Sequence, residues 1–224
     1  MTDITKVLSS NFLIWNRLNA EEKKKIADAI IVKKFVAGEA IHHGSYDCSG
    51  LIILVSGSLR TYMMNENGKQ ITLYRLFDKD ICLFSASCMM KDITFDIYID
   101  CEKDATALLI PIDQYKEIVE DSRTILDYTN RILTSRFSDI MWIFEQIAFH
   151  SLDKRLAYYL IEQSYNEDSN TLNFTHEKIA NDLGTAREVI SRMLKYFELE
   201  KIVELKRNKI IIVDEDRLSE ISEK

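Results

Sequence analysis

Residues 175–195, THEKIANDLGTAREVISRMLK, have the residue spacing of a helix-turn-helix. Ile179 and Leu183 lie four residues apart, as they would on the inner face of a short first helix. Gly184 follows and can adopt the left-handed backbone that a short turn needs. The apolar residues that continue at helical spacing after the turn are Val189, Ile190, Met193 and Leu194. The stretch therefore predicts two short helices that cross near a glycine turn.

Capping residues mark the start of both predicted helices. Thr175 stands where it can N-cap the first helix, and the small Ala180 lies where the second helix must cross closely. Thr185 stands where it can N-cap the second helix, and Thr185-Ala-Arg-Glu188 matches the pattern of a capping box. The second helix is therefore expected to begin directly after Thr185.

The outward-facing residues near the start of the second helix have side chains that suit DNA reading. Arginine can donate to both acceptors of guanine, glutamate can accept from cytosine, and serine can serve either role. The predicted base-reading residues are Arg187, Glu188, Ser191 and Arg192. The alternative is the solvated face of an ordinary amphipathic helix, in which Glu188 only closes the capping box.

A basic hairpin is expected directly after the helix-turn-helix. Residues 201–213, KIVELKRNKIIIV, contain two strand-like runs around Lys206-Arg-Asn-Lys209. A basic hairpin in this place is a wing that can contact DNA phosphates, although a charged edge hairpin that limits aggregation would look similar. The predicted phosphate contacts are Thr175, Lys178, Thr185, Lys195, Lys206, Arg207 and Lys209.

The distribution of charge supports a nucleic-acid partner more than the total does. The chain has 224 residues, of which 46% are hydrophobic and 29% charged, and a net charge of −7. From Thr185 to Lys209, however, seven basic residues stand against four acidic ones. No apolar run approaches the ~20 residues of a membrane span, and the first residues do not resemble a signal peptide. We therefore expect a cytoplasmic protein without a membrane partner.

The first half of the chain has the pattern of a strand-rich domain. Residues 19–31 suggest a short helix capped by Asn19, and residues 112–119 a brief second helix. Short strand-like runs separated by turn residues are expected at 35–36, 40–43, 51–55, 59–63, 70–76, 81–84, 94–99 and 105–111. Asn65-Glu-Asn-Gly68 is a strong hairpin signal. The pattern predicts a small β-barrel or sandwich.

Residues 123–149 contain neither glycine nor proline and predict one helix roughly 40 Å long. Its apolar residues recur at steps of three and four, which favours a two-fold dimer interface. The predicted interface residues are Leu126, Ile132, Leu133, Phe137, Ile140, Met141 and Phe144. The alternative is that this stripe packs only on its own barrel.

Taken in order, these parts resemble the CRP/FNR family of bacterial transcription regulators. In the strand-rich half the resemblance rests on residues 35–41, 54–62 and 67–74. In the second helix of the helix-turn-helix it rests on Arg187-Glu-Val-Ile-Ser-Arg192. It implies an α+β fold with an effector-sensing, jelly-roll-like double-stranded β-roll over 1–122, a dimerisation helix over 123–149 and a winged helix-turn-helix over 150–224. It also implies a homodimer on palindromic double-stranded DNA, with RNA polymerase as a candidate partner.

The effector is not identified by the sequence. A cyclic-nucleotide site of this family needs a Gly-Glu pair and an arginine for the buried phosphate, but residues 77–90 contain neither glycine nor arginine. Cyclic AMP is therefore not expected. An iron–sulfur cluster of the FNR kind needs cysteines near the N-terminus, where this chain has none. The residues that could line an effector pocket are Tyr74, Phe77, Cys82, Phe84 and Cys88.

The cysteines allow a second kind of sensor, based on metal binding or on oxidation. Cys82, Cys88 and Cys101 could together hold a metal or cluster, or a pair of them could be oxidised reversibly. Buried structural cysteines are the simpler interpretation, and His42 and His43 are expected to be ordinary roll residues because neighbours on a strand face opposite sides.

Other classes of function fit less well. A cupin-like enzyme needs at least three metal-binding histidines in the roll, where this chain has only His42 and His43. The sequence contains no nucleophile–base pair, P-loop or dinucleotide fingerprint. A protein-binding adaptor that uses the winged helix as an interface is a further alternative. We therefore expect a homodimeric, sequence-specific transcription regulator and not an enzyme, controlled by an unidentified effector at the roll.

Overall fold

The computed structural model describes residues 4–44, 49–85 and 96–223. Its backbone contacts divide the chain into two units. The first comprises Met1–Met64 and Leu73–Ile140, and the second Asn65–Thr72 and Met141–Lys224.

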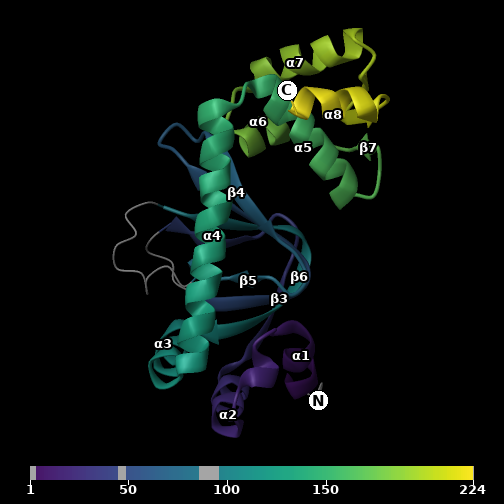
Figure 1. The fold of residues 1–224 in the computed structure, drawn as a ribbon. Coiled ribbons are helices and arrows are strands. Elements are labelled where there is room, and N and C mark those ends of the chain that lie inside the picture. The colour runs from purple at the N-terminus through teal and green to yellow at the C-terminus, as the bar shows by residue number, and fades with distance from the viewer. Residues whose placement is uncertain (1–3, 45–48, 86–95, 224) are drawn as a thin grey trace. The chain divides into compact units, whose positions relative to one another are not determined.

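The first unit is built on one antiparallel sheet (Figure 1). Its strands are β1 (Ile31–Phe35), β2 (Ala40–His43), β3 (Gly50–Met64), β4 (Gln70–Leu76, which belongs to this unit from Leu73 on), β5 (Ile81–Cys82) and β6 (Tyr98–Pro111). The order across the sheet is β1-β6-β3-β4, with β2 also paired to β6 and β5 to β3. Alternate residues of β3 and β6 contribute to two buried clusters, one with Ile53 and Leu108 and the other with Leu54 and Ala107.

The two long strands correct the strand boundaries expected from the sequence. β3 is one strand where separate strands at 51–55 and 59–63 were expected, and β6 begins at Tyr98 and runs through Lys103 without a break. The pairing of β3 with β6 shifts register between Leu54 and Leu59. Gly57 lies in this irregular stretch with φ +98°, and a Cβ there would stand 2.4 Å from the Asp104 carbonyl oxygen. Gly57, which lies between the two expected strands, therefore marks a bulge within one strand.

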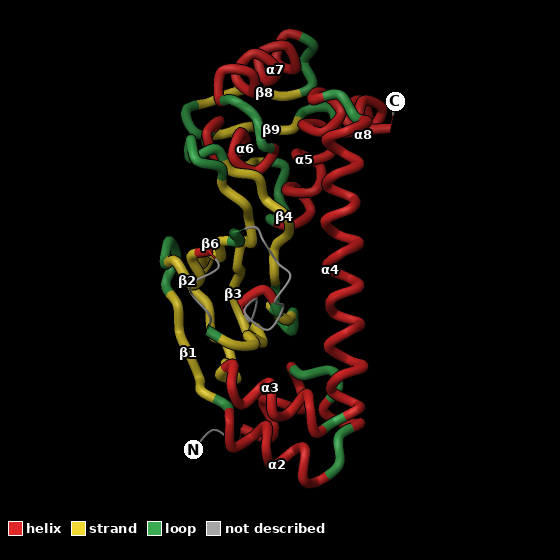
Figure 2. The backbone as a smooth tube through the Cα atoms, turned by 90° about the vertical axis from the view of Figure 1, so that its left-hand side faces the viewer, coloured by secondary structure: helices red, strands yellow, loops and turns green. Residues whose placement is uncertain are grey.

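Short helices gather at one end of this sheet (Figure 2). They are α1 (Ile4–Asn11), the 3₁₀ turn Trp15–Arg17, α2 (Ala20–Ala29) and α3 (Ile112–Asp121). The expected cap of α2 is confirmed, because the Asn19 side chain accepts from the Glu22 amide at 2.9 Å while Glu22 accepts from the Asn19 amide. Helix α1 was not anticipated from the sequence, yet its Leu8 is fully buried in the core.

The long helix α4 (Arg123–Phe149) has the bounds expected from the sequence and is unbroken along its length (Figure 1). Near its start, the Tyr115 and Thr129 hydroxyls are hydrogen-bonded at 2.6 Å, which ties α4 to α3. Ile132 and Leu133 pack against the core of the first unit. The first half of α4 is thus held within the first unit.

The second unit is a winged helix-turn-helix. Its elements are α5 (Leu152–Asn166), β7 (Thr171–Leu172), α6 (His176–Leu183), α7 (Arg187–Leu199), β8 (Val203–Lys206), β9 (Lys209–Ile212) and α8 (Glu215–Glu223). Its small sheet has the order β7-β9-β8. The apolar residues predicted for the two crossing helices are buried together, among them Ile179, Ile190 and Leu194. The end of α4 joins this unit through the Trp142 and Tyr158 rings, whose centroids are 5.2 Å apart.

Candidate nucleic-acid interface

The turn between α6 and α7 has the geometry expected of Gly184. This residue has φ +64° and ψ 40°, the left-handed conformation, and the next amide, of Thr185, donates to the Ala180 carbonyl at 2.9 Å. At the other end of α6, the Thr175 hydroxyl accepts from the Lys178 amide at 3.1 Å. The predicted cap and the predicted turn of the first helix are both confirmed.

The predicted cap of the second helix is wrong. Helix α7 begins at Arg187, its N-cap is Ala186, and no side chain caps it. The backbone amide of Thr185 closes the end of α6, and the Ala186 carbonyl accepts the first hydrogen bonds of α7, so this helix starts one residue later than expected. The capping box assigned to Thr185 and Glu188 is therefore not formed. Glu188 is exposed, and its charge is favourable in the first turn of the helix.

Gly184 gives a direct test of the turn. Gly184→Ala is expected to lower the free energy of unfolding by about 1–2 kcal/mol, because alanine resists the left-handed conformation. Gly184→Asn should lose clearly less, since asparagine tolerates this conformation and adds the same Cβ. Urea unfolding of the full chain measures both. Equal losses for the two variants would mean that crowding around the new Cβ, and not backbone strain, makes glycine necessary.

The predicted base-reading side chains share one face of α7. Arg187, Glu188 and Arg192 are exposed, and no carboxylate among the described residues lies within ion-pair distance of either arginine. Both guanidinium groups are thus available to a ligand. Ser191 is half-buried, and its Oγ lies 2.8 Å from Nδ1 of His176.

His176 is a residue of this face that the sequence analysis did not single out. It is the first residue of α6 and is half-buried. Burial lowers the pKa of the imidazole, and the nearby Arg187 charge lowers it further. The ring is therefore neutral at neutral pH and can act as a donor at one nitrogen and an acceptor at the other. The sequence contains no local signal for the contact, because Ser191 is 15 residues away.

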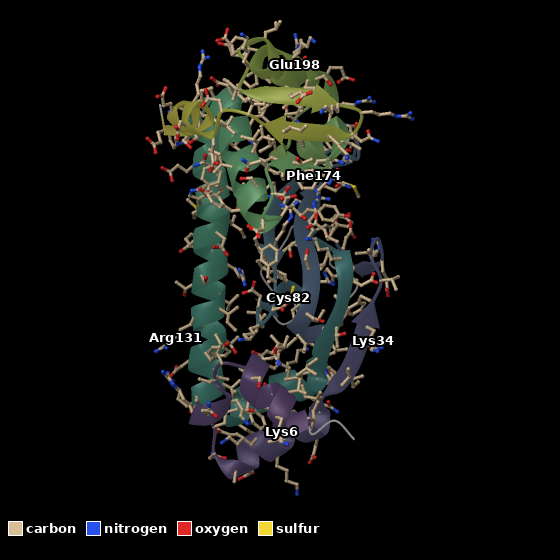
Figure 3. All side chains as sticks on the ribbon, turned by 90° about the vertical axis from the view of Figure 1, so that its right-hand side faces the viewer. Lys6, Lys34, Cys82, Arg131, Phe174 and Glu198 are labelled. Carbon is tan, nitrogen blue, oxygen red and sulfur yellow. The ribbon has the colours of Figure 1, made fainter. Side chains whose placement is uncertain are left out.

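The predicted phosphate-binding residues differ in their exposure and in their present contacts. Thr175, Lys206, Arg207 and Lys209 are exposed, and Thr185 and Lys178 are half-buried. The Lys195 ammonium is already 2.7 Å from Glu198, and that of Lys178 is 5.3 Å from the centre of the Phe174 ring. Nitrogen-ended side chains extend from the turn end of the β8–β9 hairpin (Figure 3). The wing thus presents positive charge at its tip.

Comparison with known proteins shows what the second unit and the whole chain are similar to. A helix-turn-helix domain described as Crp-like matches residues 154–221. A crystal structure assigned to the CRP/FNR family of transcriptional regulators, from Eubacterium rectale, is 48% identical to this chain. The two agree with a TM-score of 0.94, over 96% of this chain and 100% of the other. The chain belongs to the CRP/FNR family of transcription regulators.

More distant proteins are also similar to this chain. Electron transport regulator A of Shewanella oneidensis is 27% identical over 214 residues, which covers 90% of this chain and 83% of that protein. A CRP/FNR-family regulator from Thermus thermophilus agrees with a TM-score of 0.71 at 18% identity, over 87% and 99% of the two chains, a likeness that concerns the fold. This family consists of transcription regulators and not enzymes, and α6 and α7 form its DNA-binding helix-turn-helix.

In this CRP/FNR chain, the residues predicted for an effector pocket are only partly brought together. The Tyr74 and Phe84 rings are both buried, with centroids 6.0 Å apart, whereas Phe77 is 42% exposed. Cys82 is buried inside the sheet domain (Figure 3), and Cys88 lies outside the described residues. The Arg136 guanidinium of α4 stacks 4.6 Å from the centre of the Tyr74 ring.

One buried polar atom in this unit, Nε of Arg136, has no hydrogen-bond partner in the described part of the chain. The neighbouring Tyr74 hydroxyl faces the Thr61 hydroxyl, and their hydrogen bond lowers the pKa of Tyr74 by less than burial raises it. Burial raises the pKa of Tyr74 well above its usual range, so its hydroxyl keeps the proton and remains a donor. Leaving a buried polar atom unsatisfied costs about 1–3 kcal/mol, so hydrogen bonds to a bound polar molecule here would be favourable.

The described cysteines have the surroundings of structural residues. Cys82 and Cys101 are free and buried, and burial raises the pKa of both thiols. A raised pKa reduces the fraction of reactive thiolate. Within residues 4–44, 49–85 and 96–223, no three histidine, cysteine or acidic side chains are grouped as a metal site would require. The third cysteine of the predicted set, Cys88, is not among these residues.

The apolar residues predicted for a dimer interface divide into two groups. Ile132, Leu133 and Ile140 pack at least partly against the chain's own core. Phe137 is 64% exposed and Phe144 58%, and Met141 is also exposed. Leu126 is half-buried near the start of α4. The exposed members follow one another at steps of three and four, so α4 carries an uncovered apolar face on its second half.

No helix in the described ranges combines the length and the apolarity that crossing a membrane requires.

Proposed function

We propose that this CRP/FNR regulator binds a palindromic DNA operator as a homodimer. The observation that carries the proposal is the exposed face of α7, on which Arg187, Glu188 and Arg192 stand together with no described carboxylate pairing the two arginines. With α7 in the major groove, Arg187 and Arg192 donate to guanine while Glu188 accepts from cytosine. We propose a cytoplasmic location, in keeping with DNA as the ligand.

The apolar face of α4 supports the homodimer. A monomer rarely exposes several large apolar side chains in a row, and Phe137, Met141 and Phe144 lie within about 60° around the helix. Two copies of this face packed about a two-fold axis would bury them and would relate two α7 helices by the same symmetry. A palindromic operator matches that symmetry.

The stoichiometry of the complex tests this proposal. Purified full-length protein is mixed with a duplex selected for tight binding, and the mass of the complex is measured by sedimentation. We expect two chains per duplex. One chain per duplex at saturation, with full affinity, would contradict the homodimer. Binding that depends on neither salt concentration nor DNA sequence would contradict sequence-specific DNA binding and would favour a protein-binding adaptor.

We further propose that a small polar molecule in the roll controls DNA binding. The support is the buried Nε of Arg136 on α4, which has no hydrogen-bond partner among the described residues and belongs to a guanidinium stacked on the Tyr74 ring. A ligand that recruits Arg136 away from the Tyr74 ring would shift the packing of α4 and, through a two-state dimer, the distance between the reading helices. A ligand that stabilises the wild-type protein but not Arg136→Ala, and also changes operator affinity, would support this relay.

The wing gives a prediction of its own. Arg207→Ala is expected to weaken binding to all duplexes by a similar factor and to reduce the slope of log affinity against log salt by about 1 per half-site. The reason is that Arg207 is an exposed cation at the hairpin tip, and a contact with a phosphate carries no sequence information. Fluorescence anisotropy at several salt concentrations measures both effects. An altered base preference in this variant would instead mean that the wing reads sequence.

A further inference from the structure

Ser191 is the base-reading candidate whose hydroxyl is already engaged within the protein. Its Oγ lies 2.8 Å from Nδ1 of His176, a contact between the second turn of α7 and the first residue of α6. Arg187, Glu188 and Arg192 are exposed, whereas Ser191 and His176 are both half-buried. The direction in which Ser191 presents its hydroxyl is therefore set by a residue outside the recognition helix.

The contact restricts what Ser191 can offer to a base. A serine hydroxyl has one donor and two acceptor lone pairs, and it normally rotates to suit its partner. If Nδ1 of His176 is unprotonated, the Ser191 hydroxyl donates to it and only acceptors remain for the DNA. If Nδ1 carries the proton, the hydroxyl accepts from it, and its own O–H is left for the DNA. In both tautomers the imidazole fixes the rotamer.

We propose that His176 is a positioning residue for DNA specificity, which holds the Ser191 hydroxyl so that Ser191 discriminates between bases at one position of each half-site. The inference rests on the proposed function, in which α7 reads base edges. It differs from a phosphate contact by His176, because a phosphate contact changes affinity for all sequences alike and leaves base preference intact.

Selection from a pool of random-sequence duplexes tests this inference. The proteins compared are the wild type, Ser191→Ala, His176→Phe, His176→Ala, His176→Asn and the double variant His176→Phe with Ser191→Ala. We expect His176→Phe and His176→Ala to lose discrimination at the same operator position as Ser191→Ala, by about 5-fold or more, which is the lower end for a base contact. His176→Asn should retain it, because an asparagine amide can take the place of Nδ1.

The double variant separates positioning from other roles. Its base profile should equal that of Ser191→Ala alone, since the imidazole acts through the serine. A wild-type profile in both His176→Phe and His176→Ala, or a uniform loss of affinity, would overturn the inference. An additional loss of discrimination in the double variant would also overturn it. If the wild type itself enriches no sequence, the proposed DNA reading fails, which is a different outcome.

Discussion

Arg187→Ala is expected to weaken operator binding by about 1–3 kcal/mol per half-site and to relax the choice of base at one position. Arg187 is exposed at the first position of α7, and no described carboxylate pairs with it. Its guanidinium can therefore make two parallel hydrogen bonds to guanine, which alanine removes. Titrations against the selected duplex and against a duplex changed at the contacted position measure the loss.

Arg187→Lys is the matched control for charge. Lysine keeps the positive charge but cannot make the planar two-point contact, so the salt dependence should stay near that of the wild type while the base preference weakens. If Arg187→Ala and wild type bound all duplexes with the same relative affinities, Arg187 would not read a base. The exposed arginines of α7 would then be a solvated face or part of a protein interface.

Phe144→Glu is expected to convert the dimer into a monomer and to reduce affinity for a palindromic operator by about 10²–10⁴-fold. The first effect follows because Phe144 lies on the apolar face of α4, where a carboxylate would be buried without a partner. The second follows because each half-site would then be bound without the gain from a linked second half-site. Sedimentation equilibrium and anisotropy titrations measure the two effects.

Ser135→Glu provides the matched control on the same helix. Ser135 is exposed and lies two residues before Phe137, which places it about 200° around the helix from that residue. It receives the same added carboxylate and should remain a dimer with wild-type affinity. A dimeric Phe144→Glu protein with unchanged operator affinity would exclude this face of α4 as the dimer interface.

The helix-turn-helix and the wing could be predicted from the sequence because their determinants are local. Gly184 has to be left-handed, Ile179 and Leu183 have to share a helix face, and the turn at Arg207-Asn208 lies between two strand-like runs. Each of these features depends on residues within about ten positions of one another. The long helix α4 was predicted for the same reason.

Features that depend on distant residues were predicted less well. A turn was expected between the strand-like runs 51–55 and 59–63, but pairing with β6 makes this stretch, which includes Gly57, a bulge within one long strand. The start of α7 was misplaced by one residue, because Thr185 closes the end of α6 and the Ala186 carbonyl accepts the first hydrogen bonds of α7. The contact of His176 with Ser191, which changes the interpretation of the reading face, joins residues of two helices and has no signal in either one.

The apolar stripe of α4 shows a further limit of a sequence pattern. Periodicity alone placed Ile132 and Ile140 with Phe137 and Phe144, because all four recur at helical spacing. In the folded chain the two isoleucines pack partly against the chain's own core, and the two phenylalanines remain exposed. Which part of a stripe covers the domain and which part is left for a partner depends on the path of the helix across the sheet.

The most direct test of homodimeric DNA reading is selection of duplexes by full-length wild-type protein from a random-sequence pool, followed by alignment of the enriched sequences. We expect a short G·C-containing motif present twice in inverted orientation, with the two centres about 10 base pairs, or ~34 Å, apart. An enriched motif that occurs only once per duplex, or no enrichment at low salt, would contradict a homodimer that reads DNA with α7 of each chain.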